Sequence, residues 1–239
     1  MLILRDFSTL TDKAYRVTMT ERVAHSESGQ RGAYWDDRYE RIGSKQVSWY
    51  QTRPQMSLDL IDRLQVGASA AVIDIGGGTS TLVDELLRRD FGDITVLDVS
   101  ASALATARQR LGDPDNVTWL HGDLLTWDPA RRWDLWHDRA MFHFLTSSDD
   151  QAAYLQRIQR ALRPGGIFII GTFAADGPDH CSGLPVERYD APGLIDRVNA
   201  ALDHVSIVEQ RREVHTTPNG VLQPFVWIAG IIGQSKTTR

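Results

Sequence analysis

The chain has 239 residues, a formal net charge of −5 and an isoelectric point near 5.8. This length allows one well-buried α/β domain with little left for a second, and the lack of a basic excess argues against a general nucleic-acid binder. The single cysteine, Cys181, excludes an internal disulfide framework and a cysteine-based zinc cluster. Because no apolar run is long enough to span a membrane and the N-terminus lacks an apolar signal core, we expect a cytoplasmic protein without a membrane partner.

Residues 1–30 are predicted to form an N-terminal extension. Within it, Thr11–Val23 has the composition of a helix, whereas Ser26–Gly32 has that of a polar, glycine-containing linker. Such a linker is expected to fray. The sequence assigns this segment no role.

Residues 31–66 are predicted to form a helical cap that precedes the main domain at residues 67–239. The cap is rich in aromatic residues, notably Trp35, Trp49 and Tyr50. Clustered Trp and Tyr side chains either pack in a core or cover a flat ligand, because they combine apolar area with a polar tip. The cap ends in an amphipathic helix that starts at Pro54.

The main domain opens with a strand, a glycine turn and a helix. Ala71–Ile75 is a short apolar run typical of a buried parallel strand, and Gly76–Gly78 then removes every side chain for three residues. One of Thr79, Ser80 and Thr81 is expected to cap the helix that follows. A strand, a glycine turn and a helix N-terminus together favour a nucleotide-type binding site, although a tight turn without a ligand has the same local pattern.

Strands and helices then alternate along the chain. Further strands are expected at Ile94–Leu97, Val117–Leu120, Trp133–Trp136 and Ile167–Ile170, and helices at residues 100–111, 148–162 and 191–202. The last two strands, Val205–Val214 and Leu222–Ile231, follow each other without a helix. The pattern therefore predicts an α/β fold: a doubly wound, mostly parallel seven-stranded sheet with an antiparallel C-terminal hairpin and helices on both faces.

Three aspartates follow predicted strands directly: Asp98, Asp123 and Asp138. In a doubly wound sheet, ligands bind outside the carboxyl ends of the strands. Asp98 lies 20 residues after Gly78, a separation at which an acidic side chain accepts hydrogen bonds from ribose hydroxyls. Asp123 is one strand further along, where it can accept from an adenine amino group while Leu124 or Leu125 packs on the ring. Each aspartate alone is as compatible with a solvated loop, but the three in register favour a nucleotide site.

Two nucleotide patterns compete at the glycine turn. The nicotinamide pattern Gly-x-Gly-x-x-Gly/Ala fails at Thr81. The pattern Asp-x-Gly-x-Gly-x-Gly is met by Asp74, Gly76 and Gly78, with Ser80 in the last place. With these residues, the sequence resembles the class I, seven-stranded S-adenosylmethionine-dependent methyltransferases.

The resemblance covers residues 34–232 and depends on six features in order. These are Val-Ile-Asp-Ile-Gly-Gly-Gly-Thr-Ser, Val-Leu-Asp-Val-Ser, His-Gly-Asp-Leu-Leu, Trp-Asp-Leu-Trp-His-Asp-Arg, Leu-Arg-Pro-Gly-Gly and the final strand pair. The start of the cap, with its Trp-x-x-Arg-Tyr pattern, looks like a branch that includes protein-lysine methyltransferases. That branch often has Asp-Lys-Gly after the fourth strand, whereas this chain has Asp138-Arg139-Ala140.

The resemblance implies a site for S-adenosylmethionine, with S-adenosylhomocysteine as product and no metal. In the implied site, Asp74 and the glycines hold the methionine moiety, Asp98 the ribose and Asp123 with Leu124 the adenine. Asp138 is implied to lie beside the sulfonium. The full set of implied cofactor residues is Trp35, Arg38, Asp74, Gly76, Gly77, Gly78, Ser80, Asp98, Val99, Asp123, Leu124 and Asp138.

Methyl transfer needs a base only when the nucleophile arrives protonated. The candidates are His137, Asp138 and His143, which follow the fourth predicted strand, although a loop histidine is more often a bystander. The candidates for substrate contact are Trp49, Tyr50, His180 and Tyr189. As a nucleophile, Cys181 would need an activating environment that the sequence does not reveal.

The absence of two sequence motifs typical of nucleic-acid methyltransferases narrows the expected class of substrate. The (Asn/Asp)-Pro-Pro-(Tyr/Phe) sequence of amino-methylating nucleic-acid enzymes and the Pro-Cys nucleophile of carbon-5 methylation are both absent from the sequence. We therefore expect methyl transfer to an N, O or S nucleophile of a small molecule, with a protein lysine side chain as the alternative. A nicotinamide-dependent oxidoreductase and a non-catalytic cofactor-binding module are more distant alternatives.

Overall fold

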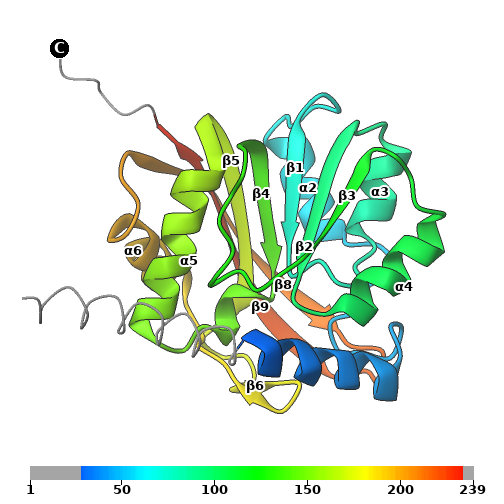
Figure 1. Cartoon of the computed structure of the whole chain (residues 1–239). Coiled ribbons are helices and arrows are strands. Elements are labelled where there is room, and N and C mark those ends of the chain that lie inside the picture. The colour runs from blue at the N-terminus through cyan, green and yellow to red at the C-terminus, as the bar shows by residue number, and fades with distance from the viewer. Residues whose placement is uncertain (1–27, 234–239) are drawn as a thin grey trace, which may run out of the picture.

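The computed structural model describes residues 28–233, so the helix expected at Thr11–Val23 lies outside the described residues. A seven-stranded sheet runs through the centre with the order β3-β2-β1-β4-β5-β9-β8 (Figure 1). Its strands are β1 (Ala71–Ile75), β2 (Asp93–Asp98), β3 (Val117–His121), β4 (Trp133–Arg139), β5 (Leu162–Phe173), β8 (Val205–Thr216) and β9 (Leu222–Ile232). The first five are parallel, and β9 is antiparallel to both β5 and β8. The predicted fold class is confirmed.

The helices divide between the two faces of the sheet. Their bounds are α2 (Gln55–Arg63), α3 (Leu82–Arg88), α4 (Ala101–Leu111), α5 (Ser148–Ala161) and α6 (Ala191–Asn199). Successive residues of a strand point to opposite faces, so Ile73 packs with α5 and α6 whereas Val72 packs with α2 and α3. No helix in the described part of the chain is both long and apolar enough to cross a bilayer.

Some boundaries differ from those that the sequence predicts. Strand β4 continues through His137 and Asp138 to Arg139, which pairs with Gly171 of β5, so the two candidate bases lie within the strand. Helix α5 ends at Ala161, one residue earlier than expected, and β5 begins at once. Residues 28–42 are helical, so the expected linker is wrong from residue 28 onward.

The helix at residues 28–42, the N-terminal helix hereafter, lies across the end of the sheet at which β4 finishes (Figure 1). Arg31 Nε donates to Asp123 Oδ2 over 2.6 Å, and Asp36 Oδ1 accepts from Ser100 Oγ over 2.6 Å. Tyr34 Oη donates to the carbonyl of Ser182, between the short strands β6 (His180–Cys181) and β7 (Leu184–Pro185). These contacts cover the carboxyl edge of the parallel strands.

Candidate functional site

A cavity of about 520 Å³, the larger cavity hereafter, lies between the N-terminal helix and the strand ends. This volume is typical of sites for small organic ligands. The structure brings seven of the predicted site residues to its wall: Trp35, Trp49, Gly76, Asp98, Val99, Asp123 and Leu124. Three aromatic side chains form one part of the wall, since Trp35 contacts Trp49 and Phe144 edge-on at ring-centroid distances of 5.8 and 5.2 Å.

The glycine turn is held so closely that side chains do not fit. Gly76 and Gly78 have φ angles of +61° and +45°, in the left-handed region that favours glycine. A Cβ atom on Gly77 would lie 2.7 Å from Asp74 Oδ2, and one on Gly78 would lie 2.5 Å from Tyr39 Oη. The turn therefore exposes bare backbone of Gly76 to the larger cavity.

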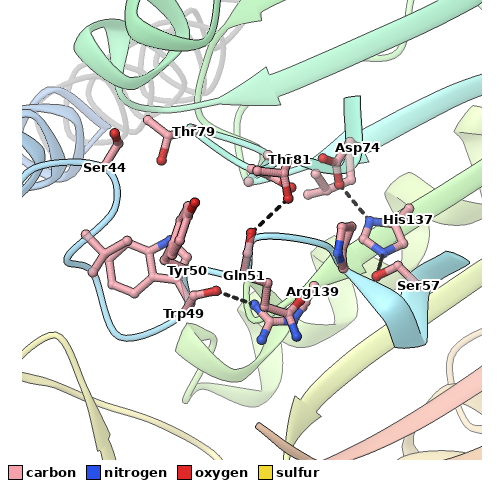
Figure 2. Close-up of a pocket in the computed structure, with 16 residues that line it drawn as sticks. Ser44, Trp49, Tyr50, Gln51, Ser57, Asp74, Thr79, Thr81, His137 and Arg139 are labelled. Carbon is pink, nitrogen blue, oxygen red and sulfur yellow. Dashed lines mark hydrogen bonds and ion pairs between the residues drawn. The ribbon is translucent and has the colours of Figure 1, made fainter. Parts of the chain in front are cut away.

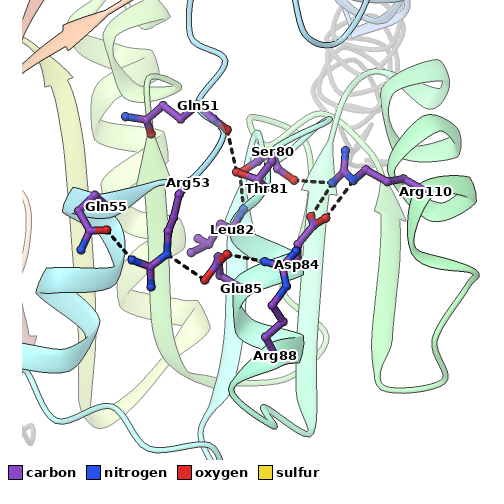
Figure 3. A network of polar contacts seen from close by, with 10 residues as sticks. All are labelled: Gln51, Arg53, Gln55, Ser80, Thr81, Leu82, Asp84, Glu85, Arg88 and Arg110. Carbon is purple, nitrogen blue, oxygen red and sulfur yellow. Dashed lines mark hydrogen bonds and ion pairs between the residues drawn. The ribbon is translucent and has the colours of Figure 1, made fainter.

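The residues after the glycines anchor the turn to its surroundings (Figure 3). Ser80 Oγ accepts from the backbone N–H of Leu82, the first residue of α3, over 3.1 Å, and Ser80 borders the smaller of two cavities in this region rather than the larger one. Thr81 Oγ1 donates to the carbonyl of Gln51 over 3.0 Å, which ties the turn to the segment before α2. From the other side, Arg110 donates to the Ser80 carbonyl and to Asp84.

Asp98 and Asp123 are nearly buried and both line the larger cavity. Asp98 Oδ1 accepts from the backbone N–H of Ser100 over 2.7 Å, and burial raises the pKa of its carboxyl to about 7, with Asp74 and Asp36 adding negative charge nearby. Asp123 Oδ1 accepts from the backbone N–H of Leu125 over 2.9 Å. Asp98, which has no side-chain donor among the described residues, is well suited to accept hydrogen bonds from a ligand, whereas Asp123 also accepts from Arg31 through Oδ2 and a ligand would share that acceptor.

Asp74 does not border the larger cavity, and its side chain points toward His137 (Figure 2). Its Oδ1 accepts from His137 Nδ1 over 2.7 Å, and His137 Nε2 lies 2.9 Å from Ser57 Oγ. All three side chains are at most 3% exposed and border a second cavity of about 40 Å³, the smaller cavity hereafter. That volume holds only a few water molecules. The Asp74–His137–Ser57 chain therefore packs against the glycine turn, and the smaller cavity beside it has no room for a substrate.

Asp138 is fully buried and belongs to neither cavity. Its Oδ1 accepts from the backbone N–H of Met141 over 2.8 Å, and its Oδ2 accepts from Phe142 N over 3.0 Å and from Tyr154 Oη over 2.6 Å. Burial raises the pKa of this carboxyl to about 7. The predicted position of Asp138 beside the reacting atoms is thus not what the structure shows, because its oxygens fold the turn after β4.

His143 is also absent from both cavities. Its ring is fully buried between Phe144 and Phe173, at a centroid distance of 4.5 Å from each, and neither ring nitrogen has a hydrogen-bond partner among the described residues. Burial and the nearby Arg139 charge lower the pKa of His143 to about 3. None of the three predicted bases therefore reaches the larger cavity.

The predicted substrate residues are scattered. Trp49 borders both cavities and Tyr50 only the smaller one. His180 is exposed and contacts Asp179, while Tyr189 packs against Phe142 in the core. Cys181 does line the larger cavity, but burial raises the pKa of its thiol to about 11, which disfavours a nucleophilic thiolate.

The wall residues that the sequence analysis did not predict include Tyr39 and Arg139. Tyr39 follows the predicted Arg38 and covers Gly78, whereas Arg38 itself borders neither cavity. The signal for Arg139 was its place directly after Asp138 at a strand end that faces ligands. Among residues 28–233, no group of three or more His, Cys, Asp and Glu side chains is arranged to hold a metal ion.

Comparisons with known proteins agree with this geometry. The profile of a family described as a methyltransferase domain matches residues 72–166. Malonyl-[acyl-carrier protein] O-methyltransferase 1 of Ilyobacter polytropus is 25% identical over 136 residues, which are 54% of this chain and 50% of that protein. EEF1A lysine methyltransferase 2 of Danio rerio is 27% identical over 171 residues, 64% of this chain and 72% of that protein. The chain thus spans half the length of the first of these relatives.

Among solved structures, the fold resembles 1,6-didemethyltoxoflavin-N1-methyltransferase of Burkholderia thailandensis, which was crystallised with 1,6-didemethyltoxoflavin and S-adenosylhomocysteine. The TM-score is 0.60 at 21% identity, covering 97% of this chain and 94% of that one. At this identity the likeness concerns the fold. The profile match over residues 72–166, the sheet order and the glycine turn together confirm the resemblance to the class I, S-adenosylmethionine-dependent methyltransferases.

Proposed function

We propose that this protein transfers a methyl group from S-adenosylmethionine to an N, O or S nucleophile of a small molecule held in the larger cavity. The observation that carries the proposal is the cavity itself. It brings the bare backbone of Gly76 together with two nearly buried carboxylates, Asp98 and Asp123, under an aromatic wall. Ribose hydroxyls and an adenine amino group are hydrogen-bond donors, which is what those carboxylates need.

The residues present fit the cofactor. Asp98 would accept from the ribose hydroxyls and Asp123 from the adenine amino group, with Leu124 against the ring and Gly76 beside the methionine moiety. When bound, the cofactor supplies a methyl group already activated by a positive sulfur. The protein then has to bind and align the two reactants and exclude water.

The acceptor would bind against the side of the cavity formed by Trp35, Trp49 and Phe144, with Cys181 and Leu184 of the β6–β7 hairpin beside it. No predicted base lines this space. An acceptor that reaches the site deprotonated, or loses its proton to water after transfer, needs no protein base. The chain's contribution would therefore be positioning, which alone accounts for several kcal/mol of a barrier, about 7–11 in well-oriented cases.

A protein-lysine acceptor is the second candidate. It is supported by the 27% identity with a lysine methyltransferase over 64% of this chain. Against it, the cavity is covered by the N-terminal helix through the Arg31–Asp123 and Tyr34–Ser182 contacts. A long protein side chain would have to enter past this cover, whereas a small molecule needs only a transient opening.

The test is calorimetric titration with S-adenosylmethionine and S-adenosylhomocysteine on the wild type, Asp98→Ala and Asp196→Ala. Asp196 is exposed on α6 and borders neither cavity, so it serves as the matched control. We expect binding by the wild type and the control, and a loss of about 1–3 kcal/mol in Asp98→Ala, because two donors lose a buried acceptor. No binding of either ligand to the wild type would overturn the proposal.

A further inference from the structure

Arg139 is the last residue of β4 and borders both cavities. Its Nη1 donates to the carbonyl of Trp49 over 2.9 Å (Figure 2). Its Nε and Nη2 are shielded from solvent and have no hydrogen-bond partner among the described residues. A buried guanidinium with one edge unpaired is rare, because burying such donors without acceptors costs free energy.

No carboxylate in the described part of the chain forms an ion pair with Arg139. Of the two carboxylates that influence its pKa, Glu213 is engaged elsewhere through both oxygens, and Asp74 through Oδ1 only, since its buried Oδ2 has no hydrogen-bond partner among the described residues. Glu213 accepts from Gln51 and from Trp227, each over 2.9 Å, and Asp74 accepts from His137. The guanidinium stays charged in proteins at any ordinary pH, so its charge lies near two carboxylates without a direct ion pair to either.

The arrangement of the unpaired Nε and Nη2 atoms also indicates which chemical group they can bind. Nε and Nη2 form one flat edge of the guanidinium, with two N–H bonds that point the same way. This edge matches the two oxygens of a carboxylate, which it binds through two parallel hydrogen bonds. The opposite edge is already fixed by Trp49, and the Arg139 guanidinium stacks over Phe225 at 4.9 Å from the ring centroid, so the free edge is preorganised.

A second guanidinium lies nearby. Arg38 likewise has a buried Nε without a hydrogen-bond partner among the described residues. The positive charges of both arginines favour the ionised thiol of Cys181, which lines the larger cavity, so both lie near that wall. S-Adenosylmethionine carries only one carboxylate. Because Arg38 borders neither cavity, Arg139 is the one of these two arginines that is placed to meet a ligand's carboxylate there.

We propose that the free Nε–Nη2 edge of Arg139 binds a carboxylate of the methyl acceptor, so that the acceptor is a small organic acid. This inference rests on the proposed function and narrows its substrate class. It also disfavours the lysine alternative, because a lysine ammonium beside the Arg139 charge would be repelled. The carboxylate anchors the acceptor, whichever of its atoms receives the methyl group.

The test compares phenylacetate with its uncharged analogue phenylacetamide, both small enough to pack against the aromatic wall. Each is titrated calorimetrically, at matched ionic strength, into protein saturated with S-adenosylhomocysteine. The proteins are the wild type, Arg139→Gln, Arg139→Lys and Arg38→Gln. We expect the wild type to bind the acid about tenfold or more tightly than the amide, the range for hydrogen bonds to a charged group. This preference disappears in Arg139→Gln and persists in Arg38→Gln.

The outcomes separate this inference from the proposed function. Absence of S-adenosylhomocysteine binding to the wild type would overturn the proposed function. Normal binding of S-adenosylhomocysteine without any preference for phenylacetate, including no binding of either probe, would overturn the role of Arg139. Loss of S-adenosylhomocysteine binding in both Arg139 variants, with Arg38→Gln unaffected, would instead assign Arg139 to the cofactor's own carboxylate. If Arg139→Gln does not fold, the proposal is still tested by the preference of the wild type for phenylacetate over phenylacetamide. It is also tested by Arg139→Lys, which retains the charge without the flat edge.

Discussion

Four neighbouring strands each place an aspartate near the carboxyl edge of the sheet, and the four divide into two pairs. Asp98 of β2 and Asp123 after β3 line the larger cavity, whereas Asp74 of β1 and Asp138 of β4 face inward. All four are at most 8% exposed, so burial does not distinguish them. The difference lies in their surroundings: the inward pair is bonded to core side chains, His137 and Tyr154, whereas the outward pair lines the larger cavity, where Asp98 has only backbone donors among the described residues and Asp123 also accepts from Arg31 at the cavity wall.

The contrast in hydrogen-bond donors is clearest between Asp138 and Asp98. Burial raises the pKa of both carboxyls to about 7. Asp138 nevertheless has three donors, from Met141, Phe142 and Tyr154, and these fold the turn that follows β4. Asp98 has backbone donors from its own turn and from Gly78 only. The inward pair should therefore act mainly on stability and the outward pair mainly on ligand binding.

The largest expected effect is that of Asp138→Ala on stability. Three buried donors would lose their acceptor, and we expect the free energy of unfolding to fall by about 3–5 kcal/mol. Tyr154→Phe removes one donor only and should cost about 1 kcal/mol. Urea denaturation measures both. A loss in Asp138→Ala no larger than in Tyr154→Phe would contradict the role of Asp138 in the turn.

The sequence predicts the order and type of the elements well, because buried strands and amphipathic helices differ in their apolar period. It fails at β4, where His137 and Asp138 have the composition of a loop. Their pairing partners, Ile169 and Ile170 of β5, are distant in sequence, and so are their side-chain partners Ser57 and Tyr154. Tertiary contacts of this kind satisfy polar groups inside a sheet, and a local pattern does not reveal them.

Of the residues predicted to contact the cofactor, more line the larger cavity than of those predicted to contact the acceptor. Asp98, Asp123 and Gly76 lie at fixed places relative to strand ends, so spacing alone indicates them. The aromatic part of the cavity wall and its surroundings are built from segments far apart in sequence, such as Trp35, Trp49 and Leu184. Arg139 was missed because its significance depends on which acids are already engaged elsewhere.

A second prediction compares how the stability of the wild type and of Asp98→Asn depends on pH. The pKa of Asp98 rises from about 3.8 to about 7 on folding, so the native state binds its proton more tightly than the unfolded chain. The resulting stability is present in full below pH 4 and is lost as the pH rises through 7. Between pH 5 and 8, the stability of the wild type relative to Asp98→Asn should fall on the order of 2–3 kcal/mol.

Urea denaturation of both ligand-free proteins across this range measures the difference. Asp138 also has a raised pKa, but it titrates in both proteins and cancels. A difference between the two proteins that stays constant with pH would show that Asp98 keeps its charge in the native state.

A third prediction distinguishes Asp98 from Asp123 by the part of the cofactor that each is proposed to contact. Asp123→Ala should weaken binding of S-adenosylhomocysteine by about 1–2 kcal/mol, because the adenine amino group loses its acceptor. The same variant should bind S-inosylhomocysteine, which lacks that amino group, as well as the wild type does. Asp98→Ala should weaken binding of both ligands alike. Calorimetric titration supplies the four affinities, and equal losses for both ligands in Asp123→Ala would place its carboxylate elsewhere on the cofactor.

The smallest expected effect comes from the far end of the Asp74–His137–Ser57 chain. Ser57→Ala removes the hydroxyl that lies 2.9 Å from His137 Nε2 and leaves the bond between His137 and Asp74 in place. Because one buried hydrogen bond is lost beside the smaller cavity, where a water molecule can replace it, we expect a loss of only about 1 kcal/mol of stability. Affinity for S-adenosylhomocysteine should change by less than about twofold, since the glycine turn rests on Asp74 directly. A variant that stays stable but binds S-adenosylhomocysteine tenfold more weakly would show that the inward pair also shapes the ligand site, and the division between the two pairs of aspartates would then fail.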